Sequence, residues 1–256
     1  GGRPLVVSLH GSGSAGRFSD LELARRSPRI FRWLVSRARV VIGVSPPLAD
    51  AAAGAGVRSV LIPHGVELPD EDRVVDHQAQ AASGETAVAL WAGRLSAEKG
   101  VDMLVEAFGK LEGVKLLVAG DGPLRHLLPE ASTSEVELLG FVPHAELLTL
   151  YERASMLVMP SHSEGFGVVA LEAMATGVPV IAARVGGLAW LVVDDVTGIV
   201  IEPGDALALR RAVEKLRDDP ALRARLGAAG RARAREEFGW DGVTTRTLAA
   251  YEQAIR

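Results

Sequence analysis

The chain has 256 residues, with 28 lysines and arginines against 32 aspartates and glutamates and a formal net charge of -4 at pH 7. This length predicts one or two domains, and 48% hydrophobic residues are enough for a packed core. The mild net charge gives no reason to expect a nucleic-acid partner. Because the sequence has no cysteine, it excludes a disulfide, a thiolate metal site and a cysteine nucleophile. No apolar run approaches the roughly 18 residues of a membrane span, and the first residues do not resemble a secretory signal. We therefore expect a soluble, cytoplasmic α/β protein.

The first quarter of the chain predicts strands that alternate with helices. Apolar runs predict three strands, over 5–9, 40–44 and 59–62. Helical segments are expected between them, over 20–39 and 46–53. Pro28 interrupts the first of these segments, which favours two shorter helices. The polar stretch 68–85 lacks any apolar period and predicts a linker.

From residue 86 a second series of strands, turns and helices begins. Strands are expected over 87–91, 114–119, 136–139, 156–159, 178–181 and 198–201. Helices are expected over 101–111, 124–128, 144–153, 167–176, a short stretch after 187, 205–238 with a break at 219–220, and the last residues after 241. The alternation predicts a parallel sheet with helices on both faces, and such sheets bind ligands at the carboxyl ends of their strands.

Residues 11–16 read Gly-Ser-Gly-Ser-Ala-Gly and formally match a dinucleotide-binding motif. That motif needs a helix that opens at once and an acidic residue about 20 positions later, at the end of the next strand. Here the helix begins near Asp20 and the next strand ends in Ser45-Pro46, so hydride transfer with a nicotinamide cofactor is disfavoured. His10 ends the first strand beside this loop, and an isolated histidine is more often a structural residue.

Six arginines lie between residues 25 and 39: Arg25, Arg26, Arg29, Arg32, Arg37 and Arg39. Such a row can contact an anionic membrane surface or an acidic substrate, although a solvated helix face is the commoner explanation. Asp70-Glu71-Asp72 formally matches a D-x-D metal site. Its place after a proline in the linker favours solvated charge instead.

The segment 156–183 reads as strand, loop, helix and strand, and it organises the candidate site. Glu164 precedes the helix and Glu172 lies on its second turn, so both carboxylates can face one ligand. The glycines beside Glu164 leave amides accessible at the helix start, where the helix dipole favours an anion. A phosphate at that end, with Glu172 for ribose hydroxyls and Glu164 for a sugar hydroxyl, suits a nucleotide sugar. Two solvated helix-end charges are the alternative.

Arg94 and Lys99 lie on one loop after the strand 87–91, and Asp121 follows the next strand. An arginine fork and a lysine ammonium suit a diphosphate, and they can stabilise a leaving diphosphate without a metal. Pairing with a local acid such as Glu98 is the alternative. The sequence shows no Ser-His-Asp triad for nucleophilic catalysis. It also shows no H-E-x-x-H motif and no His/Asp cluster, so no metal is expected.

Five motifs, in this order and spacing, resemble the retaining GT-B glycosyltransferases of family 4, the glycosyltransferase group 1 type. They are GRLSAEKG (93–100), AGDGPL (119–124), GFVPHAEL (140–147), PSHSEGFGVVALEAMATGVPVIAARVGG (160–187) and TGIVIEPGD (197–205). The resemblance runs from about residue 5 to the end of the chain. It implies two facing Rossmann-like domains and transfer of a sugar from a nucleotide-diphosphate sugar with retention of configuration, without a metal or another cofactor.

The resemblance also implies a domain organisation. Residues 1–65 would form a partial N-terminal domain on the acceptor side, 66–85 a linker, and 86–238 the complete nucleotide-sugar domain. Residues 239–256 would form a helix that crosses back to the first domain. Only about 65 residues precede the linker, so we expect the chain to lack the start of the first domain and much of the acceptor site.

Residue roles follow from the matching positions. Arg94 and Lys99 are implied to bind the donor diphosphate, Glu164 the transferred sugar and Glu172 the ribose. His10 is implied to lie near the anomeric centre. The other residues implied or expected in substrate binding are Gly165, Phe166, Gly167, Asp121, Phe141 and Val142, of which the Phe141-Val142 turn would hold the base.

The chain departs from the family pattern at two further places. His64-Gly65-Val66-Glu67 stands where Asn-Gly-Val-Asp is usual between the domains, and Ala189-Trp190 follows the paired glycines where a glutamate is common. The change at Ala189-Trp190 puts in question the packing of the short helix expected after residue 187.

Two functions remain open on the sequence. One is a glycosyltransferase with a UDP-, GDP- or ADP-linked donor and a glycan or lipid-linked acceptor. The arginines between residues 25 and 39 would allow such an enzyme to contact the cytoplasmic face of a membrane. The other is a nucleotide-sugar-binding module that needs a missing segment or partner to react. A GT-B epimerase has no support beyond the fold, and a phosphorylase would need a lysine motif for a pyridoxal cofactor that the sequence does not show.

Overall fold

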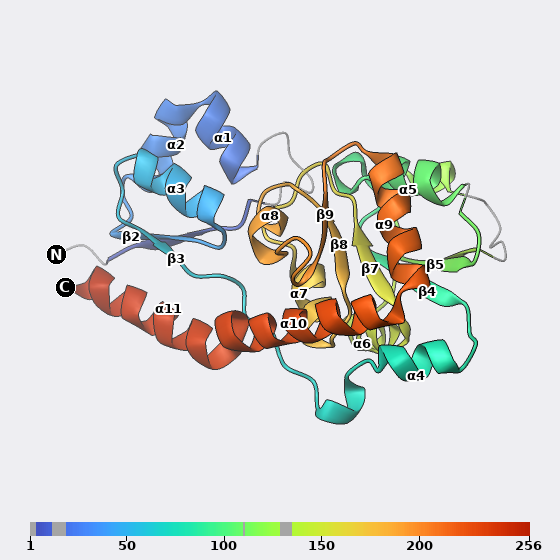
Figure 1. Cartoon of the computed structure of the whole chain (residues 1–256). Coiled ribbons are helices and arrows are strands. Elements are labelled where there is room, and N and C mark those ends of the chain that lie inside the picture. The colour runs from blue at the N-terminus through green and yellow to red at the C-terminus, as the bar shows by residue number, and fades with distance from the viewer. Residues whose placement is uncertain (1–3, 12–18, 110, 129–134) are drawn as a thin grey trace.

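The computed structural model describes residues 4–11, 19–109, 111–128 and 135–256, so most of the glycine-rich motif at 11–16 lies outside the described residues. Two parallel sheets form the framework (Figure 1). The first has the order β1-β2-β3 and is built from β1 (Val6–Leu9), β2 (Val40–Gly43) and β3 (Ser59–Leu61). Its strands lie within one or two residues of the apolar runs that predicted them.

Helices cover both faces of this first sheet (Figure 1). One face packs on α1 (Asp20–Arg26), α2 (Pro28–Val35) and α3 (Pro46–Gly54), and the other on α11 (Trp240–Ile255). The alternation along β2 explains this division, since Val41 faces the cluster that contains Phe31 while Val40 faces Val243. The predicted interruption at Pro28 is confirmed, because this proline occupies the first turn of α2.

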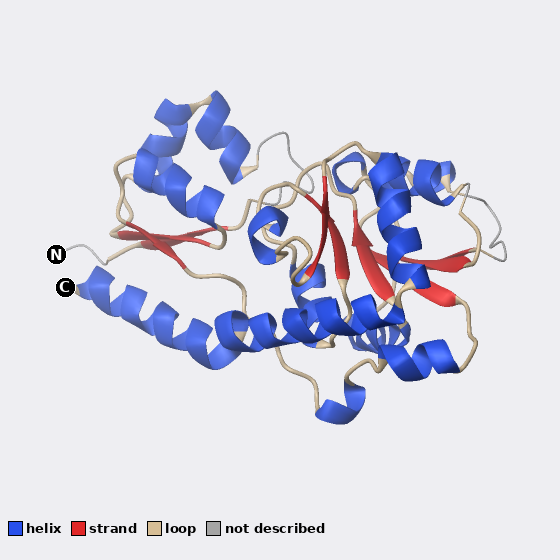
Figure 2. Ribbon diagram, in the orientation of Figure 1, coloured by secondary structure: helices blue, strands red, loops and turns tan. Residues whose placement is uncertain are grey.

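The second sheet has the order β6-β5-β4-β7-β8-β9, with every neighbouring pair parallel (Figure 2). Its strands are β4 (Ala87–Ala92), β5 (Val114–Ala119), β6 (Val136–Gly140), β7 (Met156–Met159), β8 (Val180–Ala183) and β9 (Gly198–Ile201). The chain order reverses between β4 and β7, and the carboxyl ends of strands at such a reversal are where open sheets bind ligands.

Two buried clusters sandwich the second sheet. One contains α5 (Val101–Phe108) and α9 (Ala206–Asp218), and the other contains α6 (His144–Arg153), α7 (Val168–Ala175) and α8 (Leu188–Leu191). α10 (Pro220–Phe238) contributes residues to both clusters. The described residues also include three short 3-10 turns, at Glu71–Arg73, Ala97–Lys99 and Arg125–Leu127. The last of these lies where the sequence predicted an α-helix over 124–128.

The strand predicted at 178–181 begins two residues later, at Val180. The Val178 amide still donates to Ala173 O and closes α7, and Pro179 has no amide to offer a ladder.

The polar stretch between the sheets is partly helical. α4 (His77–Ala82) packs on α10, although the sequence predicted a linker without a periodic element. His77 is buried and its Nε2 lies 3.0 Å from Gly177 O, and burial lowers the pKa of His77 below its ordinary value. Tertiary contacts therefore stabilise this helix, and its own sequence does not predict it. The predicted domain boundaries at 65, 86 and 238 stay a prediction.

Within the part of the chain that the structure describes, no helix combines the length and the apolar character needed to cross a membrane.

Candidate active site

A cavity of about 650 Å³ lies where loops of the two sheets meet. The first sheet contributes the residues after β1 and β3, and the second contributes the loops after β4 and β7. Of the residues predicted to act in catalysis or binding, it is lined by His10, Arg94, Lys99, Glu164, Gly165, Phe166 and Gly167. The structure thus brings together seven of the predicted residues from segments far apart in sequence.

A salt bridge links the two loops of the second sheet at this cavity. Lys99 Nζ lies 2.6 Å from Glu164 Oε2, and the two side chains are 24% and 7% exposed. The loops are also joined through the backbone, because the amides of His162 and Ser163 donate to Glu98 O. Lys99 therefore pairs across the cavity with the acid predicted to contact the sugar, while the alternative was pairing with its neighbour Glu98. Arg94 is exposed and lines the same cavity.

The loop that carries Glu164 is fixed by the residues after β8. The Gly187 amide donates to Glu164 O at 3.2 Å. Gly186 has a φ of +46°, and a Cβ at this position would lie 1.7 Å from Glu164 O. Only glycine fits this close approach of two backbones.

An aromatic cluster supports the same loop. Phe166 is buried, and its ring centroid lies 6.2 Å from Trp190 and 6.0 Å from Phe238. Trp190 and Phe238 are themselves 5.3 Å apart. The departure from the family pattern at Trp190 thus supplies packing beneath the loop, which answers the question that the sequence raised about this helix.

Two histidines face each other at the opening toward the first sheet. His10 Nδ1 lies 3.3 Å from His64 Nε2, and the Asp20 carboxylate accepts the backbone amides of His10 and Gly11 at 2.9 and 3.0 Å. Burial, and next the proximity of His10, lower the pKa of His64 below its ordinary value. His64 is therefore neutral at pH 7 and can accept or donate a hydrogen bond to His10.

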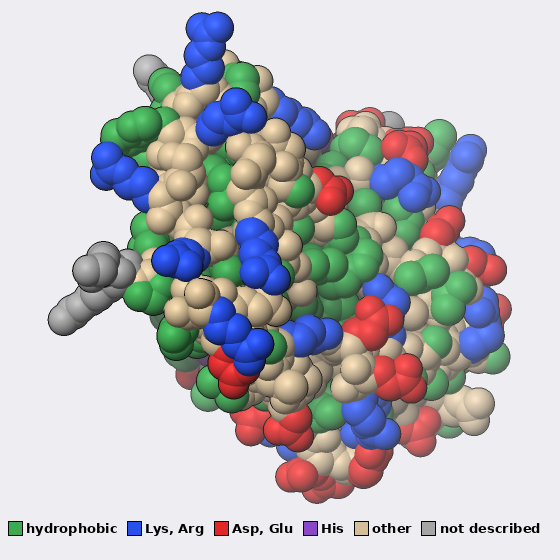
Figure 3. All heavy atoms as spheres, turned by 90° about the vertical axis from the view of Figure 1, so that its left-hand side faces the viewer, with side chains coloured by type: hydrophobic (Ala, Val, Ile, Leu, Met, Phe, Trp, Pro, Cys, Tyr) green, Lys and Arg blue, Asp and Glu red, His purple; other side chains and the backbone are tan. Residues whose placement is uncertain are grey.

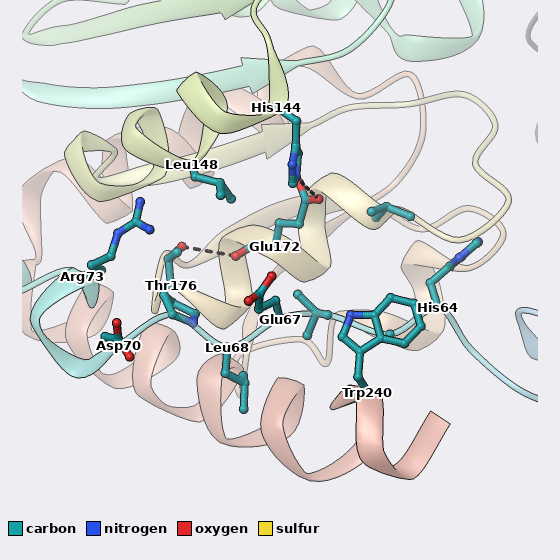
Figure 4. A pocket seen from close by; sticks show the side chains of 14 residues that line it. His64, Glu67, Leu68, Asp70, Arg73, His144, Leu148, Glu172, Thr176 and Trp240 are labelled. Atoms are coloured by element: carbon teal, nitrogen blue, oxygen red, sulfur yellow. Dashed lines mark hydrogen bonds and ion pairs between the residues drawn. The ribbon is translucent and has the colours of Figure 1, made fainter. Parts of the chain in front are cut away.

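Glu172 lies in an adjoining pocket of about 490 Å³ (Figure 4). His144 Nε2 lies 2.9 Å from its Oε1, and the Tyr151 hydroxyl donates to its Oε2 at 2.9 Å. His64 and Val168 line both cavities, so the two are neighbours. The sequence predicted that both glutamates face one ligand, and the structure places them on two adjoining cavities that an extended ligand could span.

Three predicted residues do not line either cavity: Asp121, Phe141 and Val142. The Asp121 carboxylate accepts the Gly122 amide at 2.7 Å and its carbonyl accepts the Leu95 amide, so it braces the loop that carries Arg94. Phe141 is 81% exposed at the end of β6.

Three residues of this region had no predicted role: Tyr151, His144 and His64. Tyr151 is an apolar-face residue of α6 by pattern, and no sequence spacing indicates that its hydroxyl reaches Glu172. His64 did carry a signal, because it replaces an asparagine at the turn between the predicted domains.

Across the described residues, no group of three or more His, Asp or Glu side chains is placed to hold a metal ion. At the formal D-x-D sequence, Glu71 binds Arg231 and Arg235 of α10 at 2.8 and 3.1 Å, and the hydrogen bond from Arg231 is the main cause that lowers the pKa of this carboxyl.

Comparison with known proteins gives consistent relatives. A glycogen synthase of Mycobacterium tuberculosis is 34% identical over 269 residues, which cover 99% of this chain and 64% of that protein. A D-inositol 3-phosphate glycosyltransferase of Xylanimonas cellulosilytica is 35% identical over 219 residues, or 77% of this chain and 51% of that protein. The chain thus spans 64% and 51% of the length of these two relatives.

Solved structures agree with this. A sucrose-phosphate synthase from Thermosynechococcus elongatus superposes with a TM-score of 0.78 at 28% identity, covering 98% of this chain and 67% of that one. HepE of Anabaena, solved in complex with UDP, gives 0.79 at 26% identity, covering 98% and 72%. These neighbours and the parallel sheets define an α/β fold of the GT-B type. Residues 72–233, more than half of the chain, match the family model for glycosyl transferases group 1. The chain therefore belongs to the glycosyl transferases group 1 family.

Proposed function

We propose that this chain carries the donor site of a glycosyltransferase that moves a sugar from a nucleoside-diphosphate sugar to an acceptor. The salt bridge between Lys99 and Glu164 is the observation that carries the proposal, because the two groups that would bind the phosphate and the sugar lie 2.6 Å apart in one cavity. The UDP bound to the structural neighbour HepE supports a nucleotide as the ligand.

The chemistry follows from the charges around the cavity. Arg94 and Lys99 would bind the diphosphate and stabilise the negative charge that grows on it as the bond to the sugar breaks. Glu164 would accept a hydrogen bond from a sugar hydroxyl, and His10, held by Asp20, would face the reacting carbon from the first sheet. In this proposal the two cations replace a metal and no further cofactor takes part. Retention of configuration, as the family resemblance implies, belongs to the same proposal.

A second candidate is a module that binds the nucleotide sugar without transferring it. The chain spans only part of the relatives it matches, and few of the residues that line the cavity come from the first sheet. Donor binding needs the loops of the second sheet, whereas transfer also needs a complete acceptor side.

The donor site can be tested by thermal unfolding in the presence of UDP, GDP, ADP and their sugars. A ligand at about 100 times its Kd adds roughly 2.7 kcal/mol of stability, which raises the melting temperature by several degrees. We expect one nucleotide class to give this shift and Glu172→Ala to lose most of it. Incubating that donor with candidate acceptors then separates an enzyme from a binding module, and no shift with any nucleotide would contradict the donor site.

We further propose that the acceptor side works at an anionic membrane surface on the cytoplasmic side. Figure 3 shows lysine and arginine side chains over the upper left of one face with hydrophobic side chains between them, whereas acidic side chains lie lower down and to the right. α2 in this region exposes Ile30, Trp33 and Leu34 by 55%, 62% and 48%, and it contains no acidic residue. A helix with these two kinds of side chain suits a membrane interface.

We expect the protein to sediment with phosphatidylglycerol vesicles at low salt and to stay in solution with phosphatidylcholine vesicles. Trp33→Ala should weaken the sedimentation several-fold, whereas Leu207→Ala, which removes another exposed apolar side chain on α9, should not. Equal sedimentation with both kinds of vesicle, or no sedimentation with either, would contradict the membrane proposal.

A further inference from the structure

Glu172 is held by two donors that differ in their access to solvent. The Tyr151 hydroxyl donates to Oε2 and His144 Nε2 lies at Oε1, each at 2.9 Å. Tyr151 is fully buried, whereas the His144 side chain is 67% exposed. The bond from Tyr151 is therefore part of the folded core, and the bond from His144 can be exchanged for water or for a ligand.

We propose that Tyr151 is a positioning residue for donor recognition: its hydroxyl fixes the Glu172 carboxylate so that Oε1 faces the pocket and accepts a ribose hydroxyl. This inference rests on the proposed donor site and adds to it a residue that does not touch the ligand. The ribose diol as the group that this carboxylate recognises is taken from the proposed donor site, and the role of Tyr151 is what the inference adds.

The geometry supports a directed hydrogen bond at this position. The Tyr151 hydroxyl also lies 3.4 Å from Val169 O, but its single proton goes to the shorter and charged partner at 2.9 Å. Burial, followed by the charge of Glu172, raises the pKa of Tyr151 well above its ordinary value, so the phenol stays a donor at working pH. An ionised carboxylate offers about four acceptor positions, and Tyr151 and His144 use two of them. The others remain for two vicinal hydroxyls.

Tyr151→Phe removes one oxygen atom and keeps the buried ring. We expect its Kd for UDP, measured by isothermal titration calorimetry, to rise about tenfold, which corresponds to about 1.4 kcal/mol. Its Kd for 2′,3′-dideoxy-UDP should match that of the wild type, because this ligand has no hydroxyl for Glu172 to accept. Tyr251→Phe is the matched control, since the only other tyrosine of the chain lies exposed on α11.

A double-mutant cycle separates positioning from a loosened fold. In a Glu172→Ala background, Tyr151→Phe should cause no further loss of UDP affinity, whereas a general effect on the fold would weaken binding in both backgrounds. Unchanged UDP affinity in Tyr151→Phe, or an equal loss for UDP and its dideoxy analogue, would overturn the inference and leave the donor site standing. A wild-type protein that binds none of UDP, GDP and ADP would overturn the donor site itself, and the inference with it.

Discussion

Replacing Lys99 with methionine should lower the free energy of unfolding by about 2–3 kcal/mol and abolish stabilisation by UDP. The substitution leaves the Glu164 carboxylate, which is 7% exposed, without its cation at 2.6 Å. Breaking a buried pair from one side costs about 3–5 kcal/mol, and we expect less here because the Lys99 side chain is 24% exposed. Urea unfolding with and without UDP measures both effects.

Two further variants make this prediction specific. Lys99→Met combined with Glu164→Gln should regain most of the lost stability, because the uncompensated charge is gone, yet it should not regain UDP binding. Lys115→Met is the matched control, since Lys115 and Glu137 form a pair at the same 2.6 Å with side chains 38% and 37% exposed. The control should lose less than about 1 kcal/mol. If Lys99→Met lost no more free energy of unfolding than Lys115→Met, the charge of Lys99 would matter little to the site.

The strands were predictable because each is a short apolar run bounded by turn residues. β7 is the clearest case: its four residues are buried on both faces, and the prediction over 156–159 matches its bounds. α4 was not predictable in this way. Its first residue, His77, bonds Gly177 across 100 positions of sequence, and a six-residue helix does not stand alone without such contacts.

The candidate site also has a part that the sequence predicts and a part that only tertiary contacts determine. The sequence motifs predicted the residues that line the main cavity. Their proximity was also predictable, because residues that end neighbouring parallel strands lie at one edge of the sheet. The motifs did not indicate which side chains pair, since the bond between Lys99 and Glu164 joins residues 65 positions apart and that between Tyr151 and Glu172 joins two helices. The roles of Asp121, Phe141 and Val142 in binding stay predictions.

Gly186→Ala should destabilise the protein by about 3 kcal/mol or more and weaken binding of UDP-sugars. The new Cβ would lie 1.7 Å from Glu164 O, and a backbone atom cannot rotate away as a side chain can. The loop after β7 must therefore shift, and Glu164 moves with it. Gly204→Ala is the matched control, because its φ is +87° but no atom lies within 4 Å of the added Cβ. That change carries only the cost of a left-handed conformation, about 1–2 kcal/mol. Urea unfolding of both variants compares them directly, and an equal loss of stability would mean that the contact with Glu164 does not set the position of the loop.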